Sequence, residues 1–480
     1  MKEAAKKEVQ RIPPKAADLS EWYTQVCLQA QLADYAPVRG CIVMRPYAYA
    51  IWELITAEFD RRFKATGHQN AYFPLLIPES LLVREAEHVE GFAPEVAWVT
   101  EGGGERLTER LAIRPTSEAV IGMMYAKWIQ SHRDLPVLIN QWANVMRWEK
   151  ATRPFLRTLE FLWQEGHTAH ATREEAAAEV QQMLEIYREV AEDVLALPVI
   201  SGRKSENEKF AGALSTYAIE ALMPDGKALQ AGTSHELGQN FARAYDITFT
   251  DVDEQTKHVW TTSWGVSWRI LGGLIMAHGD DNGLVLPPAI APHQVVVVPI
   301  PRKGADDVLP AARALADELR GSARVHLDDR AEQTAPWKFN EWELRGVPVR
   351  VELGKRDVDA QVVTIARRDT LSRETVPRAE AGARITALLA EIQAGLLARA
   401  RADRDARTIV ARDHASFLAA LRAQQGFVVA PWCEDAACEL EIKAQTGAVT
   451  RVIKGGAESG ASCAFCGKPA KVTAYFARSY

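Results

Sequence analysis

The strongest constraint on this chain is residues 144–167, where an alternating stretch is followed by a basic loop. The run Asn-Val-Met-Arg-Trp-Glu predicts a β-strand with Arg147 and Glu149 on one face. A second strand is expected to start near Arg157 and to carry Phe161 back. Such a hairpin offers guanidinium groups for phosphates, a carboxylate for an amine and an aromatic face for a base. It therefore suits a bound nucleoside triphosphate, although an amphipathic strand with a surface Arg–Glu pair is the competing interpretation.

Length and composition indicate a globular protein of several domains. The 480 residues are enough for two or three domains, and 47% hydrophobic with 25% charged residues is an ordinary balance. No apolar run reaches ~18 residues and no apolar core follows the charged N-terminus, so we expect neither a membrane span nor a signal peptide, and a cytosolic location. The net charge of −6 means that any RNA must be bound through local basic surfaces.

Two short segments carry further polar side chains suited to a binding site. Residues 113–118 predict a strand that turns into a helix, with Thr116 and Ser117 as N-cap candidates and Glu118 in the first turn. An ordinary helix cap is the alternative. After the hairpin, Glu165 and His167 alternate as strand residues do and are candidates to line a pocket, unless the histidine is simply structural.

An Asp-Gly pair at residues 225–226 predicts a second hairpin. Alternation along its return strand places Gln230, Gly232 and Ser234 on one face of the sheet. Thr233 and His235 are then expected on the opposite face.

A run of small residues later in the chain leads into a helix that bears Arg269. Gly265 and Ser267 in this run would let the backbone approach a nucleotide closely. Arg269 could equally cap the helix or pair with Asp280 or Asp281.

Prolines near residue 288 mark a boundary, after which strands alternate with helices up to about residue 366. This alternation predicts a small α/β domain with a largely parallel sheet. A mainly helical segment follows over residues 380–425. We therefore divide the chain into residues 1–288, 289–400 and 401–480.

Four of the six cysteines fall in the last tenth of the chain. Cys433 and Cys438 form one pair, and Cys463 and Cys466 form another that is followed by a glycine. Two such pairs suit a tetrahedral zinc–thiolate site, with disulfides as the alternative. In a reducing cytosol we favour zinc, in a structural role because all four ligand positions are filled.

These segments resemble the three motifs of the class II aminoacyl-tRNA synthetases, and the resemblance covers essentially the whole chain. Arg-x-Glu, a basic loop and Arg-x-x-x-Phe resemble motif 2, and the helix bearing Arg269 resembles motif 3. The run Pro-Phe-Leu-Arg-Thr-Leu-Glu-Phe-Leu-Trp-Gln-Glu-Gly-His, the Thr-Ser-Glu loop and the phrase Gly-Thr-Ser-His-Glu-Leu-Gly-Gln-Asn-Phe are similar to the prolyl-tRNA synthetases. The cysteine-containing tail resembles the archaeal/eukaryotic type. Only about sixty residues separate His170 from the next motif, which leaves no room for the editing domain that bacterial-type enzymes often insert.

The resemblance implies an α+β fold: a class II antiparallel sheet with helices, an α/β anticodon-binding domain and a small C-terminal α+β zinc domain. It implies ligation of L-proline to tRNA(Pro) through prolyl-adenylate, with ATP, Mg²⁺ and structural Zn²⁺. The implied proline site is Thr116, Glu118, Arg147, Glu165, His167 and His235. The implied ATP site is Arg147, Glu149, Arg157, Phe161, Gln230, Thr233, Ser267 and Arg269, of which Arg147 and Arg269 are expected to be catalytic.

The resemblance also implies macromolecular partners. Candidate anticodon contacts are Lys338, Glu341, Glu343 and Arg356. A helix followed by an extended segment with Pro74 resembles motif 1, which implies a homodimer. The terminal residue, Tyr480, is typical of this branch, and we hypothesise that its carboxylate docks near the active site.

Two other functions compete with aminoacylation. A synthetase-like protein could bind tRNA or a partner without catalysis, but such a protein should have lost some of the arginines or the Thr-Ser-Glu loop. An adenylating enzyme could load an amino acid onto another carrier, but the anticodon-type domain argues against this.

Overall fold

The computed structural model describes residues 12–88, 96–300 and 307–480. The chain forms two compact units. The larger contains Tyr35–Ile42, Ile55–Leu274 and Leu397–Tyr480, and the smaller contains Val43–Leu54, Ile275–Leu396 and the described part of Met1–Asp34. Helices α2 (Pro46–Ala65), α7 (Arg269–His278) and α11 (Ala381–Ala406) each contain residues of both units, so the division does not follow the linear order of the chain.

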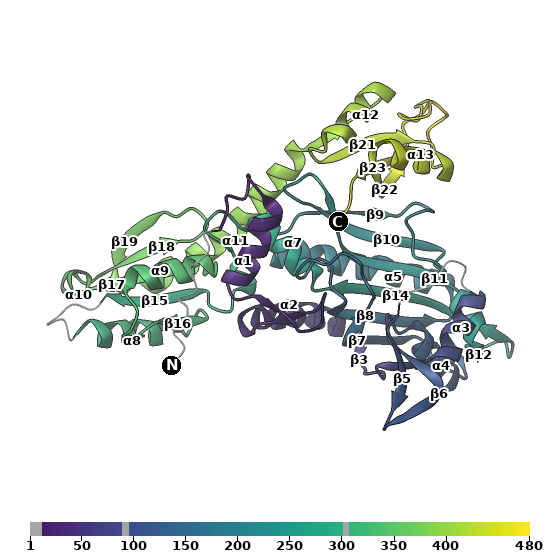
Figure 1. Ribbon diagram of the computed structural model, residues 1–480, viewed down its shortest axis with the longest axis horizontal. Helices are drawn as coiled ribbons and strands as arrows, with labels where there is room; N and C mark the ends of the chain where they lie inside the picture. Colours follow the sequence, from purple (N-terminus) through teal and green to yellow (C-terminus); the bar gives the residue numbers. More distant parts are fainter. Residues whose placement is uncertain (1–11, 89–95, 301–306) are drawn as a thin grey trace. The chain divides into compact units, whose positions relative to one another are not determined.

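A sheet of eleven strands forms the framework of the larger unit, and most neighbouring strands within it run antiparallel (Figure 1). Seven of these strands lie in the spatial order β9 (Val199–Arg203), β10 (Ser215–Leu222), β11 (Ala228–Gly238), β14 (Trp260–Ser267), β8 (Glu160–His170), β7 (Val137–Met146) and β3 (Gln69–Asn70). Beyond β9 the same sheet continues through β22 (Val449–Gly456), β23 (Val472–Ala477), β21 (Phe427–Trp432) and β20 (Thr408–Val410). The C-terminal strands thus extend the sheet formed by the first seven.

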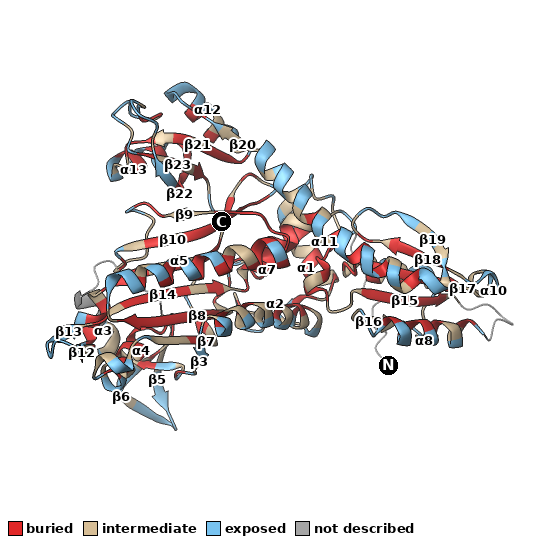
Figure 2. Ribbon diagram, turned by 180° about the vertical axis from the view of Figure 1, so that it is seen from behind, coloured by how far each residue is buried: buried red, intermediate tan, exposed pale blue. Residues whose placement is uncertain are grey.

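Helix α5 (Arg173–Glu189) covers one face of the catalytic strands. The capping box predicts its start correctly: Thr172 Oγ1 accepts from the Glu175 backbone NH at 3.2 Å, and the Glu175 side chain accepts from the Thr172 NH. Tyr187 is among its buried residues and meets Trp264 of β14, while other α5 side chains face solvent (Figure 2). This amphipathic helix closes the sheet on the face opposite the cavity described below.

A second apolar core lies at the other end of the larger unit. It joins the three-stranded sheet of β4 (Leu76–Pro78), β6 (Glu105–Ile113) and β5 (Trp98–Gly102) to α4 (Glu118–Trp128) and α6 (Asn240–Tyr245). Helix α3 (Glu79–His88) and the hairpin of β12 (Thr248–Thr250) and β13 (Thr256–His258) flank it. This core fixes the start of α4, where the Thr-Ser-Glu loop lies.

The smaller unit contains the five-stranded sheet β16 (Val325–Leu327), β15 (Val295–Ile300), β17 (Val349–Gly354), β18 (Val362–Arg367) and β19 (Arg373–Pro377). Helices α8 (Val308–Leu319), α9 (Ala335–Leu344) and α10 (Lys355–Ala360) connect the strands, and α1 (Leu19–Gln29) belongs to the same unit. The expected largely parallel sheet is wrong in part, because β17, β18 and β19 pair antiparallel. The short link from β18 to β19 permits only a hairpin, since a parallel pair needs a long crossover.

The helical prediction for residues 380–425 also needs correction. Helix α11 ends at Ala406, strand β20 follows, and α12 (His414–Ala423) comes next. The β-branched run at 408–410 pairs in parallel with β21, so sheet pairing overrides the helical composition. Among the described residues α11 is the one helix whose length and composition would permit a membrane span, yet Ile385, Leu388 and Ile392 on it are buried in the protein, as in a core helix.

Candidate active site

A cavity of about 250 Å³ opens on the catalytic sheet of the larger unit. It brings together eleven of the residues singled out from the sequence. They are Thr116, Glu118, Arg147, Phe161, Glu165, His167, Gln230, Thr233, His235, Ser267 and Arg269. Segments separated by up to about 150 residues therefore converge on one concave surface.

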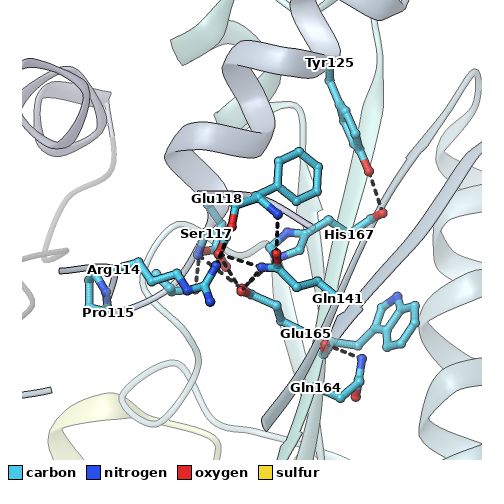
Figure 3. A network of polar contacts seen from close by, with 12 residues as sticks. Arg114, Pro115, Ser117, Glu118, Tyr125, Gln141, Gln164, Glu165 and His167 are labelled. Carbon is cyan, nitrogen blue, oxygen red and sulfur yellow. Dashed lines mark hydrogen bonds and ion pairs between the residues drawn. The ribbon is translucent and has the colours of Figure 1, made fainter. Parts of the chain in front are cut away.

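A buried polar network holds one end of this cavity (Figure 3). The Glu165 carboxylate accepts from Ser117 Oγ at 2.5 Å and from Gln141 Nε2 at 2.8 Å, and lies 3.1 Å from His167 Nε2. Tyr125 OH donates to the His167 carbonyl at 2.8 Å, which fixes the strand carrying the imidazole. Because its donors are themselves buried, this carboxylate is rigidly oriented.

The electrostatics of this end favour a charged pair. Burial by itself would raise the pKa of Glu165, but the hydrogen bond and charge of His167, with the Ser117 and Gln141 donors, hold that pKa below its usual range. Burial likewise opposes protonation of His167, yet the hydrogen bond to Glu165 and the charges of Glu118 and Glu165 raise its pKa. Both shifts favour the ionised forms, so the Glu165 carboxylate and a protonated His167 stabilise each other.

The Thr-Ser-Glu loop supplies a second carboxylate. Thr116 Oγ1 donates to Glu118 Oε2, so the hydroxyl orients the acid. Ser117 occupies the N-cap position of α4 without a capping hydrogen bond from its side chain, because its hydroxyl donates to Glu165 instead. The ordinary-cap interpretation is thus wrong for this serine. The carboxylate of Glu118 lines the same cavity as Glu165 and His167. The potential ligand atoms of these three residues lie within 4.8 Å of one another, a spacing that could hold a metal ion.

His235 completes this end as a neutral imidazole. Its Nδ1 lies 2.9 Å from Thr216 Oγ1, and its ring packs against Phe210 with centroids 4.8 Å apart. Burial, reinforced by the positive charges of His167 and Arg147, lowers the pKa of His235 to about 3.

Two arginines also line the cavity. The guanidinium of Arg147 lies 5.5 Å from the Phe161 ring centroid and 5.4 Å from that of Trp163, while its Nε donates to the Pro115 carbonyl at 3.0 Å. Arg269 opens α7 and donates from Nε to the Leu156 carbonyl at 3.0 Å. Burial first, and then the neighbouring Arg147 and Arg157, lower the pKa of Arg269 to about 10, so it remains cationic at neutral pH.

The motif 2 hairpin departs from its sequence prediction at one point. Strand β7 ends at Met146, so Arg147 and Glu149 lie just beyond the strand rather than on one of its faces. Arg157 and Glu149 do not line the cavity and instead form a half-exposed pair with a separation of 3.7 Å. The charge of Arg157 lowers the pKa of Arg269 and the charge of Glu149 raises it, so both side chains lie near this cavity residue.

The predicted facing of β11 holds for Ser234, Thr233 and His235 but is wrong for Gln230. Its register against β10 shifts between Ile219 and Glu220, where a β-bulge inserts one residue. Gln230 therefore reaches the cavity together with Thr233 and His235, whereas Ser234 donates to the Val180 carbonyl of α5 on the other face. A bulge re-aims every side chain on one side of it, and no local pattern announces it.

Several lining residues escaped the sequence interpretation. They are Trp163, Glu208, Lys209, Phe210, Thr216, Ala231, Gly232, Ser263 and Trp264, whereas Gly265 lines the cavity as expected. Alternation along β8 with Glu165 and His167 could have identified Trp163, and alternation along β14 with Ser267 could have identified Ser263. Trp264 is out of phase with those β14 residues, and the segment with Glu208 reaches the cavity only through folding of its loop.

The four C-terminal cysteines converge as predicted. Their sulfur atoms lie within 4.8 Å of one another, with Cys433 Sγ 3.5 Å from Cys466 Sγ and Cys438 Sγ 3.9 Å from Cys463 Sγ. Thiolates 2.3 Å from a tetrahedral ion are ~3.8 Å apart. The cluster therefore fits a tetrahedral metal ion.

The anticodon candidates in the smaller unit fall into two groups. Lys338 is buried and donates to the Asp328 carbonyl at 2.9 Å, and Glu341 pairs with Arg330 and Arg345, so both serve contacts within the unit. Arg356 is exposed. Glu343 borders a cavity of about 100 Å³ that four arginines, Arg350, Arg367, Arg368 and Arg373, also line.

The chain end lies on the β10–β11 hairpin. Tyr480 OH donates to Asp225 Oδ2 at 2.8 Å, its backbone NH donates to the Ala228 carbonyl, and Lys227 Nζ lies 5.0 Å from its ring centroid. Ala228 is two residues from Gln230 of the cavity.

Comparison with known proteins agrees with this geometry. Residues 98–278 match the model of the tRNA synthetase class II core domain (G, H, P, S and T), residues 294–388 an anticodon binding domain, and residues 415–480 the C-terminal domain of prolyl-tRNA synthetase. The antiparallel sheet, with arginines and carboxylates lining one cavity, is thus that of a class II aminoacyl-tRNA synthetase.

Full-length relatives narrow the class. The chain is 54% identical to a proline–tRNA ligase of Alkaliphilus oremlandii, over 100% of both chains. It is 56% identical to that of Symbiobacterium thermophilum, over 98% of this chain and 99% of the relative. A crystal structure of prolyl-tRNA synthetase from Cryptosporidium parvum, complexed with halofuginone and AMPPNP, is 42% identical with a TM-score of 0.93, over 98% of this chain and 100% of that one. The chain belongs to the prolyl-tRNA synthetase family.

Proposed function

We propose that the cavity residues form prolyl-adenylate from L-proline and ATP and then pass the prolyl group to tRNA(Pro). As a member of its family the chain is a ligase that attaches proline to tRNA, consuming ATP and releasing AMP and pyrophosphate. The observation that supports these site roles is that one cavity gathers two carboxylates, Glu118 and Glu165, with two arginines, Arg147 and Arg269. The carboxylates can orient an ammonium, and the arginines can bind phosphates.

Glu118 binds the ring nitrogen of proline. A secondary ammonium needs an anionic acceptor, and Thr116 fixes this carboxylate from behind. In the Glu165–His167 ion pair the two charges neutralise each other, and both side chains shape the wall of the pocket. Neutral His235 closes the pocket without adding a positive charge that would repel the ammonium.

Arg147 and Arg269 stabilise the charge that develops in adenylation. The proline carboxylate attacks the α-phosphorus of ATP, the bond to the bridging oxygen breaks, and pyrophosphate leaves. No protein nucleophile takes part, so positioning and charge stabilisation carry the catalysis. Arg157 assists at the cavity edge, and Mg²⁺, which enters with ATP, belongs to the substrate complex.

The remaining nucleotide contacts follow from the cavity wall. Phe161 stacks on adenine, and Glu149 accepts from the adenine amine or orders the hairpin. Gln230, Thr233 and Ser267 hydrogen-bond the rest of the nucleotide.

Amino-acid-dependent ATP–pyrophosphate exchange, tested with each of the twenty amino acids without tRNA, examines this proposal. We expect exchange to be strongest with proline. Exchange strongest with another amino acid would overturn the roles of Glu118 and His235, and exchange with none would leave a tRNA-binding protein without adenylation chemistry.

We divide the chain into a catalytic domain of residues 1–288, an anticodon-binding domain of residues 289–400 and a C-terminal domain of residues 401–480. The α/β anticodon-binding domain binds tRNA(Pro). The cavity beside Glu343, with its four arginines, and exposed Arg356 support this role. The placement of Lys338 and Glu341 inside their unit makes them supports of this surface. Anticodon changes in tRNA(Pro) should therefore weaken charging.

Zn²⁺ is held by Cys433, Cys438, Cys463 and Cys466 in a structural role. Four thiolates complete a tetrahedral ion, which ties α13 (Ala436–Thr446) to the loop at 463–466. Purified protein should contain about one zinc per chain.

Within the prolyl-tRNA synthetase family, the chain is of the archaeal/eukaryotic type, which has no inserted editing domain. Between β8 and β10, all within the described residues, stand only α5, a short π-helical turn at 190–194, β9 and a loop. We accordingly expect no hydrolysis of mischarged alanyl-tRNA. Homodimerisation through the α2–β4 region and residence in the cytoplasm complete the proposal.

A further inference from the structure

One wall of the active-site cavity is held by the C-terminal domain. The wall consists of residues 204–210, of which Glu208, Lys209 and Phe210 line the cavity. The segment leaves β9 and folds as a turn, with the backbone NH groups of Glu208 and Lys209 donating to the Ser205 carbonyl at 3.2 Å and 2.9 Å. Its position therefore depends on what holds Ser205 and its neighbours.

Glu439 of α13 accepts hydrogen bonds from two residues of this wall, Ser205 and Asn207. The side chain is 1% exposed. Its Oε1 accepts from Ser205 Oγ at 2.9 Å and from the Thr450 backbone NH at 3.1 Å, and its Oε2 accepts from Asn207 Nδ2 at 3.0 Å. A buried carboxylate that accepts hydrogen bonds on both oxygens is held in one orientation, and it fixes the positions of its donors.

Arg451 of β22 holds the wall from the other side. The register of β22 against β23 shifts between Thr450 and Val452, so Arg451 is the extra residue of a β-bulge. Its guanidinium donates to Glu220 Oε1 at 2.7 Å and lies 3.7 Å from Glu208 Oε2.

Arg451 shares Glu220 with a residue of the wall itself. Lys204, the first residue of the wall, donates to the same Glu220 oxygen at 3.2 Å. The two strands that carry these groups approach closely, since a Cβ at Gly202 of β9 would lie 2.5 Å from the Ile453 carbonyl of β22.

The wall in turn touches the groups that enclose the proposed proline site. The Phe210 NH donates to Thr216 Oγ1 at 2.9 Å, the same hydroxyl that meets His235 Nδ1. The Phe210 ring packs on the His235 ring. A displacement of the wall would therefore be transmitted to the imidazole.

We propose that Glu439 and Arg451 are positioning residues, through which the C-terminal domain sets the proline-side wall of the cavity. This inference rests on the proposed adenylation of proline. It assigns the C-terminal domain a part in amino-acid binding in addition to any structural metal that it holds. Neither side chain lines the cavity: Glu439 acts through Ser205 and Asn207, and Arg451 acts through Glu208 and through Glu220, which it shares with Lys204.

The first test compares two isosteric variants on α13, Glu439→Gln and Glu441→Gln. The new amide at position 439 would present an N–H to Asn207 Nδ2, donor against donor, whereas Glu441 is exposed and accepts only from Gln445 among the hydrogen bonds described for it. In ATP–pyrophosphate exchange we expect Glu439→Gln to raise the KM for proline about fivefold or more, with the KM for ATP nearly unchanged. Glu441→Gln should match the wild type.

A compensating change provides the rescue. Asn207→Asp combined with Glu439→Gln restores an acceptor opposite the new amide, and should recover most of the lost proline affinity. Active-site titration keeps the measurement per folded enzyme. An unchanged KM for proline in Glu439→Gln, or a loss of kcat alone, would overturn the inference.

A second pair of variants tests the arginine. Arg451→Lys keeps a cation beside Glu220 but loses the fork that also reaches Glu208. Arg478→Lys is the control, since Arg478 donates to Thr446 and Gln424 within the C-terminal domain. Only the first should raise the KM for proline, and equal values for both would refute the role of Arg451. Absence of proline-dependent exchange in the wild type would instead refute the adenylation proposal itself.

Discussion

Substitution of Glu118 by glutamine isolates the charge that holds the substrate ammonium. The amide has nearly the shape of the carboxylate and can still accept from Thr116 Oγ1. What disappears is the negative charge, in a side chain only 7% exposed. The variant therefore measures one electrostatic interaction with little change in packing.

The expected magnitude follows from burial. A hydrogen bond to a charged group contributes about 1.5–3 kcal/mol, which is roughly a 10- to 150-fold change in affinity. Two observations favour the upper half of this range. Arg147 and His167 each feel the charge of Glu118, so its removal leaves them to repel the ammonium. The new amide also turns a donor toward the donors of proline.

Steady-state ATP–pyrophosphate exchange at saturating ATP separates the possibilities. The KM for proline should rise by roughly 50-fold while kcat changes little, because the ammonium does not react and its binding is the same in ground and transition states. Glu185→Gln, which removes a surface carboxylate paired with Arg188 on α5, is the control and should behave as the wild type. A KM for proline within about twofold of the wild type would show that Glu118 does not bind the ammonium.

Four further outcomes are expected. Arg269→Gln should lower kcat for exchange by about a hundredfold or more with a small change in the KM for proline, and an equal rise in KM would contradict a transition-state role. Phe161→Leu should raise the KM for ATP about fivefold through lost stacking, as read from exchange at varied ATP. Cys438→Ser should reduce the zinc content measured by atomic absorption and lower the melting temperature. The pKa of His167 is raised above 6.5 despite burial, so its stabilisation is complete below about pH 6.5 and is lost as the pH rises through the raised value. Urea unfolding should show that loss in the wild type and not in His167→Gln.

Local patterns predicted the elements that carry the site. Thr172 and Glu175 announce the start of α5, and Asp225-Gly226 announces the second hairpin, because each acts over a few residues only. The family resemblance implied thirteen residues at the substrate site, and eleven of them line the cavity.

Non-local pairing was where local patterns failed. Arg147 lies just beyond the end of β7, where its side chain contacts Pro115, and the bulge in β11 shifts Gln230 to the other face. Neither is visible in an alternation of residue types, because both depend on segments that approach only in the folded chain.

The sequence by itself determined the chemistry of this protein: which carboxylates, arginines, aromatics and cysteines are present, and at spacings that suit an adenylating site and a metal site. The tertiary structure alone decided which of them meet. Glu439 and Arg451 lie more than 230 residues along the chain from the wall residues Ser205 and Glu208 that they contact. Such contacts depend on the close approach of β9 and β22 and on a bulge that turns Arg451 toward the catalytic strands. The burial of long-range neighbours sets these features, which no short stretch of sequence can encode.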